Sequence, residues 1–129
     1  MKIYTTSRED YLKAILVLQK TNSDVYSVDV ARYLGFSRAS VSHAVSLLSS
    51  EGFLYMDDSY ALHMTPEGRE IAEKTYDRHC FFTELLISLG VDSMTAMEDA
   101  CRMEHAISDE SFSKLKEHFA PEIRAAQKE

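Results

Sequence analysis

The sequence is poor in cysteine, proline, glycine and long apolar runs. Its 129 residues include 2 Cys, 2 Pro, 4 Gly and no Trp. Because two cysteines cannot build a disulfide framework, we expect reduced thiols and a cytoplasmic protein. No apolar run approaches the roughly 20 residues that span a bilayer. The start, "MKIYTTSRED", has no apolar signal core, so no membrane partner is expected.

Positive charge is also scarce. The formal net charge is −7, whereas proteins that bind nucleic acids usually carry a basic surface. The acidic excess lies mainly in the second half. Residues 71–129 hold 7 Lys+Arg against 12 Asp+Glu, and residues 1–70 hold 7 against 9. Net charge therefore weakens a DNA-binding interpretation without excluding it, because the first half can still present a locally basic or neutral face.

The first half has the pattern of three helices followed by a hairpin. Ser7 is the expected N-cap of the first helix, Ser27 of a short second helix that ends at Gly35, and Ser37 of a third that ends at Gly52. "FLYMDDSYALHMT" then reads as two short strands around a turn. This order predicts a winged helix-turn-helix over residues 1–65. The alternative is a small helical domain with an incidental hairpin.

The second half, residues 66–129, is predicted to be entirely helical. Thr65 is the expected cap of a long helix that runs to Gly90. Ser93 is the expected cap of the next helix, and Ser108 of a last helix that ends before Pro121. The predicted fold class is mainly α, with a winged helix-turn-helix domain followed by an all-helical domain.

The stretch "EDACRMEH" places a thiol, a carboxylate and an imidazole close together, at Cys101, Glu104 and His105. Residues three and four positions apart lie on one face of a helix. These groups suit a divalent transition metal, which would need further ligands from elsewhere in the chain. The alternative is an ordinary amphipathic helix with a buried thiol, whose Glu and His face water.

Five stretches in order resemble the diphtheria-toxin-repressor family of metal-dependent transcriptional regulators, which includes iron-dependent repressors and manganese transport regulators. They are "EDYLKAI", "FSRASVSHAVSLLSSEGFL", "ALHMTPEGREIA", "RHCFFTELLISLGVD" and "EDACRMEHAIS". Together they span roughly residues 7–119. The resemblance implies a DNA-binding part and a helical metal-binding and dimerisation part. Many iron-type members add an SH3-like domain, and this chain is expected to be the shorter version without it.

The resemblance implies a primary metal site formed by Asp10, Cys101, Glu104 and His105, with His79 belonging to an adjacent site. The ligand set is a hybrid, since Asp10 is typical of manganese-type relatives and Cys101 of iron-type relatives. A soft thiolate discriminates against manganese. Fe(II) is therefore the favoured ion, with Mn(II) as the alternative, and Zn, Co or Ni could occupy the same ligands in vitro.

A second metal site is in doubt. Lys13 stands where manganese-type relatives place a further Glu ligand, and an ammonium cannot ligate while it is protonated. Thr83 and Met97 stand where iron-type relatives place the Glu and His that accompany His79. We therefore expect one well-formed site in each subunit.

The resemblance also implies a homodimer that binds palindromic, double-stranded operator DNA and represses metal-uptake genes, with no small-molecule substrate. The expected DNA-contacting residues line the start of the third helix and are Ser37, Arg38, Ala39, Ser40, Ser42 and His43. Arg38 is the one strong cation among them, suited to a phosphate or a guanine.

Two other classes of protein fit the sequence less well. A metalloenzyme would need an open coordination position and a general base, and the chain offers no second group of catalytic residues, so we expect no enzyme. A metal-independent winged-helix regulator that senses thiol oxidation through Cys80 or Cys101 is the alternative function. Replacing Cys101 separates the two, because only a metal switch would lose affinity for its ion.

Overall fold

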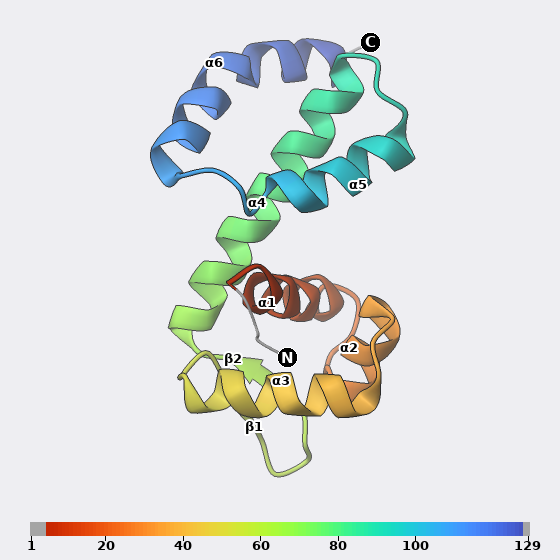
Figure 1. Cartoon of the computed structure of the whole chain (residues 1–129), viewed down its shortest axis with the longest axis vertical. Helices are drawn as coiled ribbons and strands as arrows, with labels where there is room; N and C mark the ends of the chain where they lie inside the picture. Colours follow the sequence, from red (N-terminus) through yellow and green to blue (C-terminus); the bar gives the residue numbers. More distant parts are fainter. Residues whose placement is uncertain (1–4, 128–129) are drawn as a thin grey trace. The chain divides into compact units, whose positions relative to one another are not determined.

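The computed structural model describes residues 5–127 of the chain, in which six helices and one hairpin follow one another (Figure 1). The elements are α1 (Thr5–Gln19), α2 (Ser27–Leu34), α3 (Arg38–Ser50), β1 (Leu54–Met56), β2 (Leu62–Met64), α4 (Pro66–Ser88), α5 (Ser93–Met103) and α6 (Asp109–Gln127). The mainly α prediction is confirmed. The chain forms two compact units, Met1–Lys74 and Thr75–Glu129. The boundary between the units thus falls inside α4, between Lys74 and Thr75.

The N-terminal unit is built on the apolar faces of α1, α2 and α3. Ile15, Val30 and Val41 are fully buried, one from each helix. Burying a side chain of this size stabilises the fold by about 1.5–3 kcal/mol. Gly35 connects α2 to α3 with a left-handed φ of 73°, and its N–H donates to the carbonyl of Ala31. A residue with a Cβ adopts this conformation only at an energetic cost, so glycine suits the turn of a helix-turn-helix.

The caps of these helices are partly as expected. The Ser37 hydroxyl accepts a hydrogen bond from the N–H of Ser40 at 3.1 Å, which confirms it as the N-cap of α3. The other two expectations are wrong. α1 begins at Thr5, so Ser7 lies within the helix. α2 is capped by Tyr26, whose N–H donates to the Asp29 carboxylate at 2.9 Å, and Ser27 is already helical.

The hairpin pairs β1 with β2 in antiparallel register, with Tyr55 opposite His63. Its turn is organised by Asp57, whose carboxylate accepts from the N–H groups of Ser59 at 2.8 Å and Ala61 at 3.0 Å. His63 belongs to the same network, since its Nε2 lies 2.8 Å from Asp57 Oδ2 and its ring stacks on Tyr55 with centroids 5.0 Å apart. The wing is therefore held by a polar network at its turn.

Close backbone contact joins the wing to α4. Thr65 caps α4 as expected, since its hydroxyl accepts from the N–H of Gly68 at 3.1 Å. A Cβ on Gly68 would lie 2.0 Å from the carbonyl oxygen of Phe53. Only glycine therefore allows the first turn of α4 to lie this close to the backbone that enters β1.

The C-terminal unit packs α4, α5 and α6 around an aromatic cluster. Phe81 meets Phe82 and Phe112 edge-to-face, with ring centroids 5.3 and 5.4 Å apart. α6 was expected to end before Pro121, but it continues to Gln127. Ile123, two residues beyond the proline, is buried in this cluster, and its burial offsets the backbone hydrogen bond that proline removes. Across residues 5–127 no helix is long and apolar enough to cross a membrane.

The Asp57 network makes the wing sensitive to acid. The hydrogen bond from His63, followed by that from the Ala61 N–H, holds the pKa of Asp57 below its usual value. A depressed pKa in the folded state means that this stabilisation is present at neutral pH and is lost as the pH falls through the folded-state pKa. We expect the amide signals of Ser59 and Ala61 to titrate together below the ordinary aspartate value of about 3.9.

Two-dimensional NMR across an acid titration measures this directly, with Asp57→Asn as the variant and Asp58→Asn as the matched control. Asp57→Asn should abolish the shared titration, and Asp58→Asn should leave it unchanged. A titration midpoint at or above the ordinary aspartate value would contradict the network.

Candidate functional site

The candidate metal ligands of the C-terminal unit lie together between α4 and the end of α5. The ligand atoms of His79, Cys101 and Glu104 all lie within 4.8 Å of one another. His79 Nδ1 is 2.9 Å from Glu104 Oε2 and 3.8 Å from Cys101 Sγ. Residues about 25 positions apart in the chain are thus brought into one cluster.

Glu104 is at the centre of this cluster. Its other carboxylate oxygen, Oε1, lies 3.3 Å from Nε2 of His105, so each oxygen faces an imidazole. The Glu104 side chain is fully buried, and that of His105 is only 7% exposed. A buried carboxylate is costly unless positive charge or hydrogen bonds compensate it. A carboxylate, a thiol and two imidazoles, once deprotonated, form a donor set that fits a divalent transition metal.

The expected helical arrangement of this cluster needs two corrections. α5 ends at Met103, and Glu104 is its C-cap, so His105 lies beyond the helix. The burial is also the reverse of the amphipathic alternative, because Cys101 is exposed and Glu104 is buried. Ala96 and Ala100 are the buried residues of α5. Glu104 follows Ala100 by four positions, so it continues the inward face.

Asp10, the remaining expected ligand, lies on α1 of the N-terminal unit, where it is half-buried. Lys13 is buried three residues further along the same helix. In the C-terminal unit, the Thr83 hydroxyl is buried without a hydrogen-bond partner among the described residues, and Met97 is exposed. Neither side chain is a carboxylate or an imidazole, so a second complete ligand set around His79 stays in doubt.

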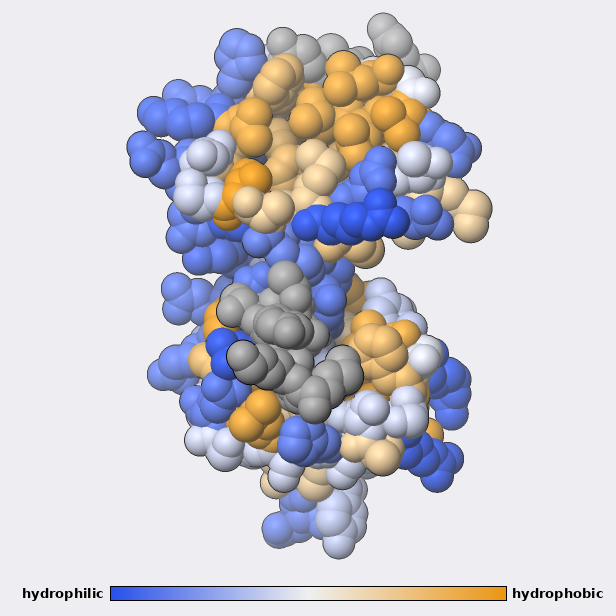
Figure 2. Space-filling view, viewed as in Figure 1, coloured by the Kyte–Doolittle hydropathy of each residue, from blue (hydrophilic) through white to orange (hydrophobic). Residues whose placement is uncertain are grey.

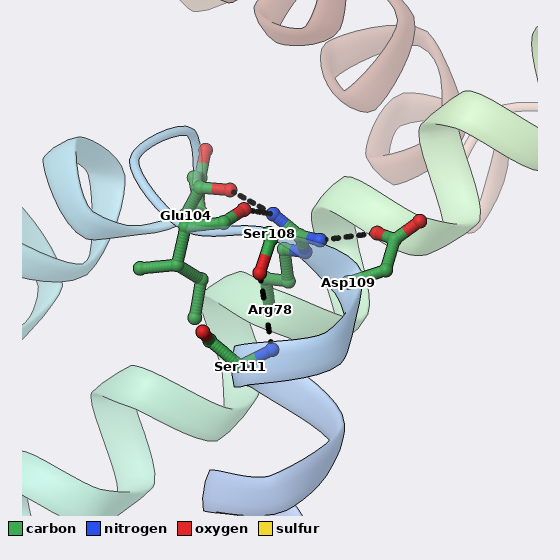
Figure 3. A network of polar contacts seen from close by, with 6 residues as sticks. Arg78, Glu104, Ser108, Asp109 and Ser111 are labelled. Atoms are coloured by element: carbon green, nitrogen blue, oxygen red, sulfur yellow. Dashed lines mark hydrogen bonds and ion pairs between the residues drawn. The ribbon is translucent and has the colours of Figure 1, made fainter.

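Figure 3 shows a residue next to this cluster that the sequence pattern did not single out. Arg78 directly precedes His79, and its guanidinium reaches the backbone carbonyl of Glu104 and the carboxylate of Asp109. The local sequence gives no signal of a buried cation, because Arg78 stands between Asp77 and His79. Its partners lie 26 and 31 positions away, which no local pattern reveals.

The first turns of α3 present a polar surface. The buried residues of α3 are Val41, Ala44, Val45 and Leu48. All six residues expected to contact DNA are exposed, namely Ser37, Arg38, Ala39, Ser40, Ser42 and His43. The Ser37 hydroxyl also lies 3.0 Å from that of Ser40, so it is part of the cap network. Arg38 and His43 have the largest side chains among these six exposed residues.

Two family models match the chain in succession. "Iron dependent repressor, N-terminal DNA binding domain" matches residues 4–61, and "Iron dependent repressor, metal binding and dimerisation domain" matches residues 65–120. The matches follow the two parts of the fold, with the α3 surface in the first and the Glu104 cluster in the second.

Individual relatives and solved structures support the same assignment as the family models. The chain is 33% identical over 112 residues to an HTH-type transcriptional regulator of Methanocaldococcus jannaschii, covering 85% of this chain and 90% of that protein. It is 34% identical over 103 residues to the transcriptional regulator MntR of Salmonella typhimurium, covering 80% of this chain and 66% of that protein. A solved manganese-dependent transcriptional repressor in complex with manganese superposes with a TM-score of 0.78 at 26% identity, covering 88% and 52% of the two chains.

This chain thus spans about two thirds of MntR and about half of the solved repressor. Both parts of the fold and both halves of the sequence lead to the same assignment. The chain belongs to the iron-dependent repressor family, the diphtheria-toxin-repressor group of metal-dependent transcriptional regulators.

Proposed function

We propose that this protein is a repressor that binds operator DNA as a homodimer when a divalent metal occupies the Glu104 cluster, and that it controls metal-uptake genes. The observation that carries the proposal is the convergence of His79, Cys101 and Glu104 within 4.8 Å around a fully buried carboxylate. Such a carboxylate, next to an exposed thiol, fits a metal-binding role better than a purely structural one. Thiol sensing without metal is not favoured, because the family consists of metal-dependent regulators.

The proposed ligands are Asp10, Cys101, Glu104 and His105, with His79 at an adjacent position. A bound divalent ion would supply positive charge to the buried Glu104 carboxylate and to the Cys101 thiolate. His79 and His105 each offer a ring nitrogen when neutral. Cys101 supports Fe(II) over Mn(II), because thiolate is a soft ligand, while the carboxylates accept either ion. Zinc, cobalt and nickel remain in vitro alternatives.

Asp10 is included because the family resemblance assigns it to the primary site. It lies on α1, in the same unit as α3, whereas the other ligands lie in the C-terminal unit. A ligand from α1 would make the DNA-binding unit respond to the metal. Moving a two-state equilibrium from 1:99 to 99:1 requires about 10⁴-fold preference for one state. Loss of Asp10 should therefore weaken the coupling to DNA as well as metal affinity.

The exposed face of α3 is the proposed DNA-reading surface. Arg38 offers a planar guanidinium to a phosphate or a guanine, and Ser40, Ser42 and His43 offer hydrogen-bonding groups. Because the chain carries a net charge of −7, few cations are available to offset the repulsion from DNA. Binding should therefore weaken strongly as salt rises, and each cationic contact should have a large share in affinity.

Fluorescence anisotropy on labelled DNA from the gene's own upstream region tests the metal switch. Fe(II) and Mn(II) are titrated separately under anaerobic conditions. We expect Fe(II) to tighten DNA binding at a lower free concentration than Mn(II), because of the Cys101 thiolate. Asp10→Ala and Cys101→Ser should each remove most of the metal response.

Arg38→Ala serves as the DNA-side control in the same assay. It should weaken DNA binding about 5- to 150-fold, the equivalent of 1–3 kcal/mol, and leave metal binding unchanged. Equal DNA binding by the wild-type protein in chelator and in saturating metal would refute the switch.

The proposed dimer surface lies on the C-terminal unit, one face of which is rich in apolar side chains (Figure 2). We assign to it the large apolar residues of this unit that are exposed, from around the end of α4 and from α5: Ile87, Leu89, Met94 and Met97, with Leu89 70% accessible. Large exposed apolar side chains close together mark protein interaction sites. A second copy of this chain is the proposed occupant, because the matching family model describes a dimerisation domain over residues 65–120.

Leu89→Glu should shift the protein from dimer to monomer, because a carboxylate at this surface would be buried without a partner. Sedimentation velocity over a range of protein concentrations measures the shift. Met56→Glu, at an exposed apolar position of the wing, is the matched control and should remain dimeric. An unchanged dimer in Leu89→Glu would place the interface elsewhere.

A further inference from the structure

Arg78 is a buried cation beside the metal ligands. Its side chain is only 8% exposed and lies on α4 directly before His79. Nη1 donates to the carbonyl of Ile107 at 2.7 Å and to that of Glu104 at 3.4 Å. Nη2 forms an ion pair with Asp109 (Figure 3). The guanidinium therefore contacts both ends of the connection between α5 and α6, residues 104–108.

This connection carries Glu104 and His105 but has little regular backbone bonding of its own. The N–H of Glu104 donates to Ala100 at 2.9 Å and that of Ala106 to Met103 at 3.1 Å, and α6 then starts at Asp109. The Glu104 and Ile107 carbonyls both point to Nη1 of one side chain. Because a guanidinium is planar and presents its donors in a fixed fork, it fixes the orientation of the groups it binds.

We propose that Arg78 is a positioning residue for metal binding, which holds the connection so that the Glu104 carboxylate lies between the rings of His79 and His105. The inference rests on the proposed metal site. Arg78 and His79 are adjacent on α4, so the anchor of the connection and one of the ligands share a rigid support. A ligand displaced by about 1 Å loses its contact with the ion, so a residue that sets this geometry should control affinity.

Nearby contacts of α6 separate positioning from general packing. Arg78 and Lys116 both lie against the Phe112 ring, with the charged groups 5.2 and 5.7 Å from its centroid. Lys116 also pairs with Asp77 at 2.8 Å, so it too ties α6 to α4. Within residues 5–127 its ammonium contacts Asp77 and the Phe112 ring rather than residues 104–108. Lys116→Gln therefore loosens α6 and leaves the connection untouched, which makes it the matched control.

Anaerobic titration of the full chain with Co(II) tests the proposal, because thiolate-to-Co(II) absorption reports affinity and ligand geometry together. Arg78→Lys keeps the positive charge and loses the fork. We expect its Co(II) affinity to fall about 10- to 100-fold, as for other residues that orient metal ligands, with an altered absorption spectrum. Lys116→Gln should keep the wild-type affinity and spectrum, even where thermal unfolding shows lower stability.

The outcomes separate this inference from the proposed function. If the wild-type protein binds no Co(II), the proposed metal site is wrong, and this inference fails with it. If the wild type binds Co(II) and Arg78→Lys binds it equally well with the same spectrum, only the positioning role is overturned. Should Arg78→Lys not fold, Asp109→Ala decides, because it removes the carboxylate that accepts from Nη2 and leaves Arg78 in place. Weaker Co(II) binding supports the proposal, and unchanged binding overturns it.

Discussion

The burial of the Glu104 carboxylate is the constraint on which the site depends. A carboxylate with no solvent exposure must be compensated by positive charge or hydrogen bonds. In this chain the His79 and His105 rings each face one of its oxygens, and the Cys101 thiol lies beside the His79 ring. Three elements of structure supply these groups: α4, the end of α5 and the connection that follows it. An amphipathic helix in isolation would have turned Glu104 to water. Its inward direction comes from Ala96 and Ala100, which bury the same face of α5.

The burial of Glu104 also makes the geometry of the proposed metal ligands depend on the packing of the core. Arg78, buried against the aromatic cluster, binds the connection that carries Glu104, so the ligand geometry and the core of the C-terminal unit depend on one another. In the N-terminal unit, the buried face of α3 fixes which residues remain exposed for DNA. The proposed ligand Asp10 lies on α1 of that unit. The proposed function thus uses features that the fold requires in any case: a buried face in each helix and a capped, polar start to α3.

Much of the fold could be predicted from the sequence, because local signals were strong there. The periodicity of α3, the Ser37 cap and the Gly35 turn specify a helix-turn-helix without reference to distant residues. The failures have two kinds of cause. At the start of α2 the cause is local, because Asp29, three residues after Tyr26, supplies the side-chain acceptor in place of Ser27. At α6 the cause is tertiary, because the burial of Ile123 carries the helix through Pro121. The residue types of the Glu104 cluster were predictable, whereas the exposure of Cys101 and the contacts of Arg78 were not, since both are set by long-range packing.

X-ray absorption spectroscopy on the protein loaded anaerobically with Fe(II) tests the central claim most directly, because it identifies the atoms bound to the ion. The account predicts a first shell of nitrogen and oxygen with one sulfur, and loss of that sulfur in Cys101→Ser. A shell without sulfur in the wild-type protein, or one that Cys101→Ser leaves unchanged, would contradict the assignment of the Glu104 cluster as the metal site.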